Sequence, residues 1–227
     1  LYFGHSVLRI RRLLPGTFQE TGASGTYRSK EVYLMTKPTE TLSEQAKTRT
    51  RQITLTGLMT AVLCILGPLS IPLPVSPVPI TLTNLAVFFA VYLLGVRQST
   101  VCLLVYLCLG TAGLPVFSSF SGGLGKLAGP TGGYLIGFIF LALIQGFLMK
   151  AFPGKNTAAV IGMILGMAVC YLFGTAWLAT QMELTFPAAL SIGVLPYLPG
   201  DGVKIIIAAV AGPKLRSAVQ RAVHDSI

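Results

Sequence analysis

Charged side chains are scarce in this sequence of 227 residues: only 11% are Asp, Glu, Lys or Arg, whereas 53% are hydrophobic. This shortage of charge and a mean hydropathy of +0.73 exclude a soluble globular domain. The formal net charge of +10 does not indicate a nucleic-acid partner, because nine of the 17 basic residues precede residue 53 and the others are sparse. The composition predicts a protein that crosses the lipid bilayer several times.

Residues for metal binding and nucleophilic catalysis are also few. The only histidines, His5 and His224, lie near the two ends of the chain, so they cannot complete a Ser-His-Asp or Cys-His arrangement. No CxxC pair occurs, and the cysteines are interpreted as small hydrophobic residues rather than ligands or disulfides. The sequence therefore predicts no metal site, no cofactor and no enzymatic activity. The cysteines are Cys64, Cys102, Cys108 and Cys170.

A phosphate-binding loop is absent too, although one stretch, Pro115–Phe138, is dense in glycine. Gly125-Lys126 is followed by Leu127 instead of Ser or Thr, and the glycine spacing GxGxxxG does not fit the dinucleotide fingerprint. Six glycines between Gly122 and Gly133 alternate with apolar residues, unlike a flexible linker. We expect an ordered loop whose backbone approaches something closely.

Six hydrophobic segments predict the fold: an all-α membrane protein, a compact bundle of six transmembrane helices with an ordered glycine-rich outer loop. Several segments are shorter than the roughly 20 residues that a bilayer requires, so their ends are less certain than their number. The segments are Ile53–Leu69, Ile80–Val96, Ser99–Leu114, Gly133–Met149, Thr157–Ala179 and Pro199–Pro213.

Lys and Arg residues flank these segments on one side, which predicts a location in the cytoplasmic membrane with both termini in the cytoplasm. The opposite, outer side receives the Pro-rich turn Ser70–Pro79, the glycine-rich loop and the connection Thr180–Leu198. The start LYFGHS resembles the remnant of an engineered protease site. We therefore interpret residues 1–34 as a non-native, vector-derived extension, 35–52 as a cytoplasmic polar lead, 53–215 as the membrane domain and 216–227 as a cytoplasmic tail.

Asp201 and Lys204 are the ionisable residues placed most unusually, just before the last apolar run. Their i, i+3 spacing puts them on one face of a helix, and Pro199 suits its first turn. One interpretation is that Asp201 caps the helix and that Lys204 pairs with Asp201. Because ionisable side chains in a membrane are costly and usually face a cavity, we favour a role in binding a solute.

The string GLPVFSSFSGGLGKLAGPTGGYLIGF, with PVPITL before it and PGDGVK after it, resembles the BioY family from about Thr54 to Leu215. The members are biotin-specific membrane capture subunits, the S components of energy-coupling-factor transporters. The resemblance implies capture and uptake of biotin together with a coupling transmembrane protein and two cytoplasmic ATPases, because this chain has no nucleotide site. It also implies that small residues of the first span, here Gly57 and Ala61, dock the coupling protein; internal helix packing explains that pair equally well.

The expected site combines the charged pair with the glycine-rich loop. Asp201 would accept a hydrogen bond from the ureido group of biotin and Lys204 would meet its carboxylate. Relatives commonly have Gln-Thr after PITL, whereas this chain has Thr83-Asn84, so we do not expect Asn84 in the site. The remaining expected binding residues are Ser119, Ser121, Gly122, Gly123, Gly125, Thr131, Gly132, Gly133 and Tyr134.

Two other functions stay open on the sequence alone: a self-contained facilitator or channel, and an intramembrane enzyme. A channel requires a polar stripe through several spans, but the ionisable groups here lie at one end. An enzyme requires an acid-base pair, for which only Asp201 with Lys204 is available.

Overall fold

The computed structural model describes residues 25–74 and 76–224, with side chains described for 46–74 and 76–222. The chain divides into two units, Leu1–Thr48 and Arg49–Ile227, and the pocket and helices discussed below belong to the second. Of the predicted extension 1–34, residues 1–24 lie outside the described residues, so that boundary stays a prediction. The predicted tail 216–227 is helical as far as His224.

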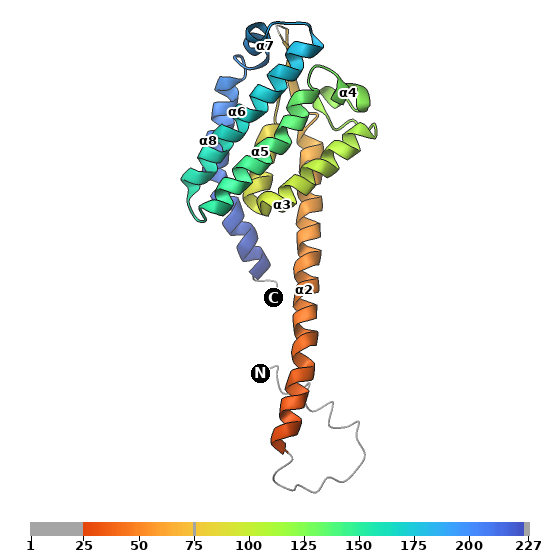
Figure 1. Cartoon of the computed structure of the whole chain (residues 1–227), viewed down its shortest axis with the longest axis vertical. Coiled ribbons are helices and arrows are strands. Elements are labelled where there is room, and N and C mark those ends of the chain that lie inside the picture. The colour runs from red at the N-terminus through yellow and green to blue at the C-terminus, as the bar shows by residue number, and fades with distance from the viewer. Residues whose placement is uncertain (1–24, 75, 225–227) are drawn as a thin grey trace. The chain divides into compact units, whose positions relative to one another are not determined.

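The described chain is almost entirely helical, which confirms the predicted all-α membrane fold (Figure 1). A two-stranded antiparallel hairpin is the exception: it replaces the expected turn after the first span, pairing Ser70 with Thr81 and Ile71 with Ile80. The elements are α2 Gly25–Leu66, β1 Ser70–Leu73, β2 Ser76–Thr81, α3 Thr83–Thr111, the 3₁₀ turn η1 Ser118–Phe120, α4 Leu124–Ala128, α5 Gly132–Ala151, α6 Asn156–Gln181, α7 Phe186–Gly193 and α8 Leu198–His224.

Helix α3 contains two of the predicted spans. Gly95 interrupts it with φ 73° and ψ 179°, a backbone conformation open to glycine and strained for other residues. After this break the chain runs beside α2, where Thr56 donates to Gln98 and Thr60 to Cys102 Sγ, both at 3.3 Å. Gly95 is therefore the turn between two spans (Figure 1).

Three described helices, α3, α5 and α6, are long and apolar enough to cross a membrane. Helices α7 and α8 meet at a bend of 55° and form a fourth candidate if the two together are one span. The prediction counted six segments because it divided α3 between Val96 and Ser99, close to the observed break at Gly95, and included the last part of α2. Each of those six segments is helical over most of its length. The count of spans depends on the break in α3.

Connections gather at the two ends of the helices in the second unit (Figure 1). At one end the glycine-rich loop is tied to its neighbours: Ser119 N–H donates to the Pro68 carbonyl at 3.1 Å, and Trp177 Nε1 donates to the Gly129 carbonyl at 3.0 Å. These bonds order the loop, as expected. The other end carries Gly95 and the short turn between α5 and α6.

Helices α5 and α6 form the most extensive contact of the bundle. Gly174 lets them approach, because a Cβ atom there would lie 2.3 Å from the ring of Tyr134. The hydroxyl of Tyr134 then donates to the Gly193 carbonyl of α7 at 3.2 Å. This packing fixes one wall of the cavity described next.

Candidate binding pocket

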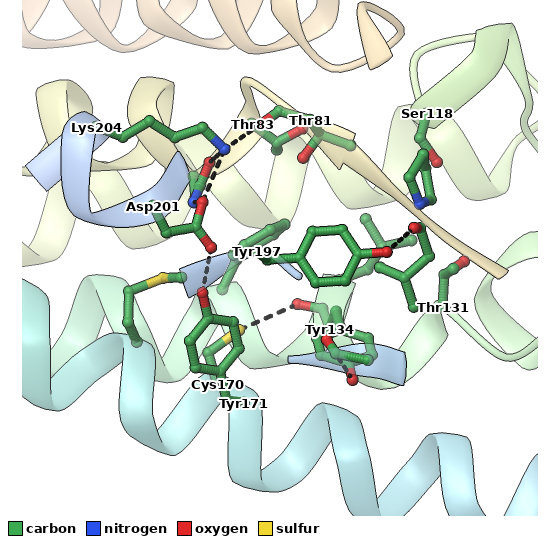
Figure 2. A pocket seen from close by; sticks show the side chains of 17 residues that line it. Thr81, Thr83, Ser118, Thr131, Tyr134, Cys170, Tyr171, Tyr197, Asp201 and Lys204 are labelled. Carbon is green, nitrogen blue, oxygen red and sulfur yellow. Dashed lines mark hydrogen bonds and ion pairs between the residues drawn. The ribbon is translucent and has the colours of Figure 1, made fainter. Parts of the chain in front are cut away.

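A pocket lies at the end of the bundle that carries the hairpin and the glycine-rich loop (Figure 2). Strand β2, helices α3, α5, α6, α7 and α8 and the loop each contribute to it. Apolar side chains form much of the wall, and the polar residues cluster. The lining residues are Val78, Pro79, Thr81, Thr83, Asn84, Ser118, Thr131, Tyr134, Leu135, Phe138, Met167, Cys170, Tyr171, Gly193, Tyr197, Asp201 and Lys204.

A buried cluster of hydrogen bonds surrounds Asp201 and Lys204, which are 7% and 8% exposed. Asp201 Oδ1 accepts from Lys204 Nζ at 2.8 Å and from Asn84 Nδ2 at 2.7 Å. The second oxygen, Oδ2, accepts from the hydroxyl of Tyr171. We call Asn84, Tyr171, Asp201 and Lys204 the polar cluster.

The ammonium group of Lys204 has all three of its protons in use. Besides Asp201, it donates to the Thr81 carbonyl at 2.6 Å and to Asn84 Oδ1 at 3.1 Å. A buried cation needs an opposite charge and further acceptors to offset its desolvation, and this geometry supplies both. The cluster is thus electrically neutral and largely saturated before any ligand enters.

Hydroxyl groups occupy the opposite end of the pocket. Figure 2 shows Ser118 and Thr131 there, with the ring of Tyr197 between them and the polar cluster. Tyr197 is held by its hydroxyl, which donates to the Val78 carbonyl. The pocket therefore has two polar ends separated by aromatic and aliphatic surface.

Comparisons with known proteins agree with this architecture. A sequence model of the BioY family matches residues 37–221. The chain belongs to the BioY family. It is 38% identical over 172 residues to a protein of Rhizobium etli named "Biotin transporter BioY", covering 72% of this chain and 91% of that protein. A Thermotoga maritima protein of the same name is 36% identical over 166 residues, covering 73% and 96%.

A solved structure is similar as well. The crystal structure of the S-component for biotin from an ECF-type ABC transporter has a TM-score of 0.71 and 32% sequence identity. The alignment covers 75% of this chain and 93% of that one. Both the sequence and the three-dimensional arrangement of this BioY-family chain thus resemble a protein that binds biotin.

Four of the residues singled out from the sequence line the pocket: Asp201, Lys204, Thr131 and Tyr134. The helix predicted to start near Pro199 does so, since α8 begins at Leu198. None of the hydrogen bonds that the structure gives the Asp201 side chain goes to the backbone of α8. Asp201 therefore acts as a pairing partner for side chains: of the capping interpretation, the pairing of Lys204 with Asp201 is observed, and a side-chain cap is not.

The other predicted residues lie outside the pocket wall. Ser119 is exposed, and its hydroxyl bonds that of Ser70 at 3.0 Å. Ser121 donates to the Ser118 carbonyl at 2.6 Å, within the loop itself. The glycines Gly122, Gly123, Gly125, Gly132 and Gly133 are likewise absent from the lining residues.

The close approach expected of these glycines is made to other parts of the chain. A Cβ atom at Gly132 would lie 1.6 Å from the Leu127 carbonyl oxygen, and one at Gly122 would lie 2.3 Å from that of Leu114. Lys126, the one charge of the loop, also stays outside the wall, and burial lowers its pKa. The glycine-rich loop shapes the pocket by folding tightly, while Ser118 and Thr131 reach it.

Sequence reasoning missed Asn84 and Tyr171. Asn84 was set aside because of its shift relative to the glutamine of relatives, yet it bonds both members of the charged pair. The available signal was an amide at the start of an apolar span, where an unpaired polar group is costly. Tyr171 gave no signal, because a tyrosine among apolar residues of a helix is equally typical of a packed core.

Proposed function

We propose that this chain is the subunit of a biotin uptake system that captures the vitamin. One observation carries the proposal: a pocket inside the membrane domain has the polar cluster at one end, hydroxyl groups at the other and apolar surface between them. The names of the similar proteins identify biotin as the solute.

The chemistry of biotin fits the division of the pocket. Its ureido group has two N–H donors and a carbonyl acceptor, its fused rings and aliphatic chain are apolar, and a carboxylate ends the chain. Leu135, Phe138 and Met167 offer apolar contact for the rings and chain. The two polar ends of the pocket then receive the two polar ends of the vitamin.

Asp201 and its neighbours suit the ureido group better than the carboxylate. Among the described side chains, Asp201 Oδ2 accepts only from Tyr171 and can accept a ureido N–H as well, and the second N–H of Asn84 can donate to the ureido carbonyl. A carboxylate at this end would lie close to that of Asp201, with repulsion between like charges. We therefore revise the expected pairing of Lys204 with the carboxylate and assign the carboxylate to the end formed by Ser118 and Thr131.

Energy coupling requires other subunits, which we propose to be a coupling membrane protein and two cytoplasmic ATPases. Gly57 and Ala61 support a docking surface on α2, because both are exposed and a Cβ atom at Gly57 would meet nothing within 4 Å. Internal packing within this chain does not account for the pair.

The basic residues near Gly95 and at the turn between α5 and α6 support the expected orientation with both termini in the cytoplasm.

Equilibrium titration of the purified protein in detergent tests the function. Biotin is expected to bind, whereas thiamine and riboflavin are not. Biotin amide, which lacks the carboxylate charge, should lose affinity only modestly if hydroxyl groups receive that end. Absence of biotin binding by folded protein would refute the proposed function.

A further inference from the structure

A second cavity lies at the other end of the helical domain from the polar cluster, between α3, the turn joining α5 to α6, and α8. Arg216 on its wall follows Lys204 by 12 residues, which is about 18 Å along a helix. Apolar side chains, Tyr92, Met149 and Phe152, form one part of the wall. Lys155, Arg216 and Gln220 form another.

Pro213 of α8 lies on the wall of this cavity. Pro213 has no N–H, so it cannot donate to the Ala209 carbonyl four residues earlier. Asn156 replaces the missing donor, with Nδ2 at 3.0 Å from that oxygen, and its Oδ1 accepts from the hydroxyl of Tyr92 at 2.8 Å. These bonds join α3, α6 and α8 around the cavity and leave its cations uninvolved.

No carboxylate among the described side chains lies within ion-pair distance of the cations on the wall. Asp201–Lys204 is the sole ion pair among the side chains of residues 46–74 and 76–222, so neither Lys155 nor Arg216 contacts a carboxylate there. The sequence has no Asp or Glu from residue 45 to residue 182. Glu183 and Asp201 belong to the pocket end. The cavity is therefore strongly favourable for an anion.

We propose that this cavity binds a phospholipid with an anionic headgroup, its phosphate between Lys155 and Arg216 and an acyl chain along the apolar wall. Basic pockets between transmembrane helices at the membrane surface recognise such headgroups. Phe152, 54% exposed beside the two cations, gives the apolar surface that a lipid contacts and a soluble phosphate does not. The lipid ties the turn between α5 and α6 to α8.

Native mass spectrometry of the detergent-solubilised protein tests this site by titration with phosphatidylglycerol and, separately, phosphatidylcholine. Phosphatidylglycerol should bind more tightly. The double variant Lys155→Gln/Arg216→Gln should lose about thirtyfold in that affinity, because each basic residue near an anionic lipid contributes about 1 kcal/mol. Ser217→Trp, which keeps both charges but fills the cavity, should reduce binding as well.

The matched control is Lys150→Gln/Lys214→Gln, which removes two charges near the same end from residues that do not line the cavity. This control should keep phosphatidylglycerol affinity within about twofold of the unaltered protein, less than the effect of one charge-assisted hydrogen bond. Equal losses in both double variants, or undiminished binding by the Ser217→Trp protein, would overturn the cavity site. Competition by glycerol 3-phosphate or inorganic phosphate as effective as by the lipid would assign the site to a soluble anion and overturn the lipid proposal.

Discussion

A lysine, a tyrosine and an asparagine occur at each end of the helical domain, but their bonding partners differ between the two ends. At the pocket end a lysine, a tyrosine and an asparagine bond one buried carboxylate, that of Asp201. At the other end the corresponding residue types have no carboxylate near them among the described side chains. The pairs are Lys204 and Lys155, Tyr171 and Tyr92, and Asn84 and Asn156.

Access to water explains the difference between the two lysines and between the two asparagines. Lys204 and Asn84 are buried, so each polar atom must find a partner inside the protein. Lys155 and Asn156 are exposed, and water can replace a lost partner. Polar residues at the pocket end therefore determine each other's positions, as a selective binding site requires, while Asn156 mainly compensates for a proline.

Replacing Lys204 should have the largest effect. Lys204→Met leaves Asp201 as an unpaired buried carboxylate, and breaking such a pair typically costs about 3–5 kcal/mol. We expect a large fall in the melting temperature of the ligand-free protein in detergent and loss of biotin binding. Asp201→Asn added to this variant should restore part of the stability, because the uncompensated charge is gone.

Lys155→Met is the matched control at the other end. Its side chain is exposed and contacts no described carboxylate, so the melting temperature in detergent should stay nearly unchanged. An equal destabilisation by both substitutions would show that the two ends do not differ as burial implies.

Removing the hydroxyl of Tyr171 should have an intermediate effect that falls mainly on binding. Hydrogen bonds to charged groups contribute about 1.5–3 kcal/mol, which is roughly ten- to a hundredfold in affinity. Tyr171→Phe should therefore weaken biotin binding by about tenfold, because Asp201 Oδ2 loses the donor that orients it. Isothermal titration measures the loss.

Tyr92→Phe is the corresponding change at the other end, where the hydroxyl bonds neutral Asn156. Biotin affinity should not change. An equally small change in biotin affinity for Tyr171→Phe and Tyr92→Phe would mean that Tyr171 does not position Asp201.

The helices of this domain could be predicted because long apolar segments and their charged flanks are local features of the sequence. The charged pair could be predicted for a similar reason: an ionisable residue next to an apolar span is conspicuous. Asn84 could not, because its role depends on a residue 117 positions away. The local sequence around Asn84 contains no information about that distant residue.

The hairpin and the role of the glycines were also beyond the sequence. Prolines in Ser70–Pro79 indicated a turn, but strand pairing depends on the register between β1 and β2. The glycines indicated close approach without identifying the partners, which are the backbone at Leu114 and Leu127 and the side chain of Trp177. In each case the missing information was a contact between distant or folded-back segments.

Replacing Asn156 should have the smallest effect and should spare binding. Asn156→Ala removes the bonds to Tyr92 and to the Ala209 carbonyl, but the site is open to water, so we expect a loss of about 1 kcal/mol in stability. Pro213→Ala restores a backbone N–H for that carbonyl. If Asn156 compensates for the proline, Asn156→Ala should cost less in the Pro213→Ala background, with a coupling of about 0.5–1 kcal/mol measured by a double-mutant cycle of unfolding. Additive losses would show that Asn156 does not serve the proline, and a fall in biotin affinity would show that the two ends are not independent.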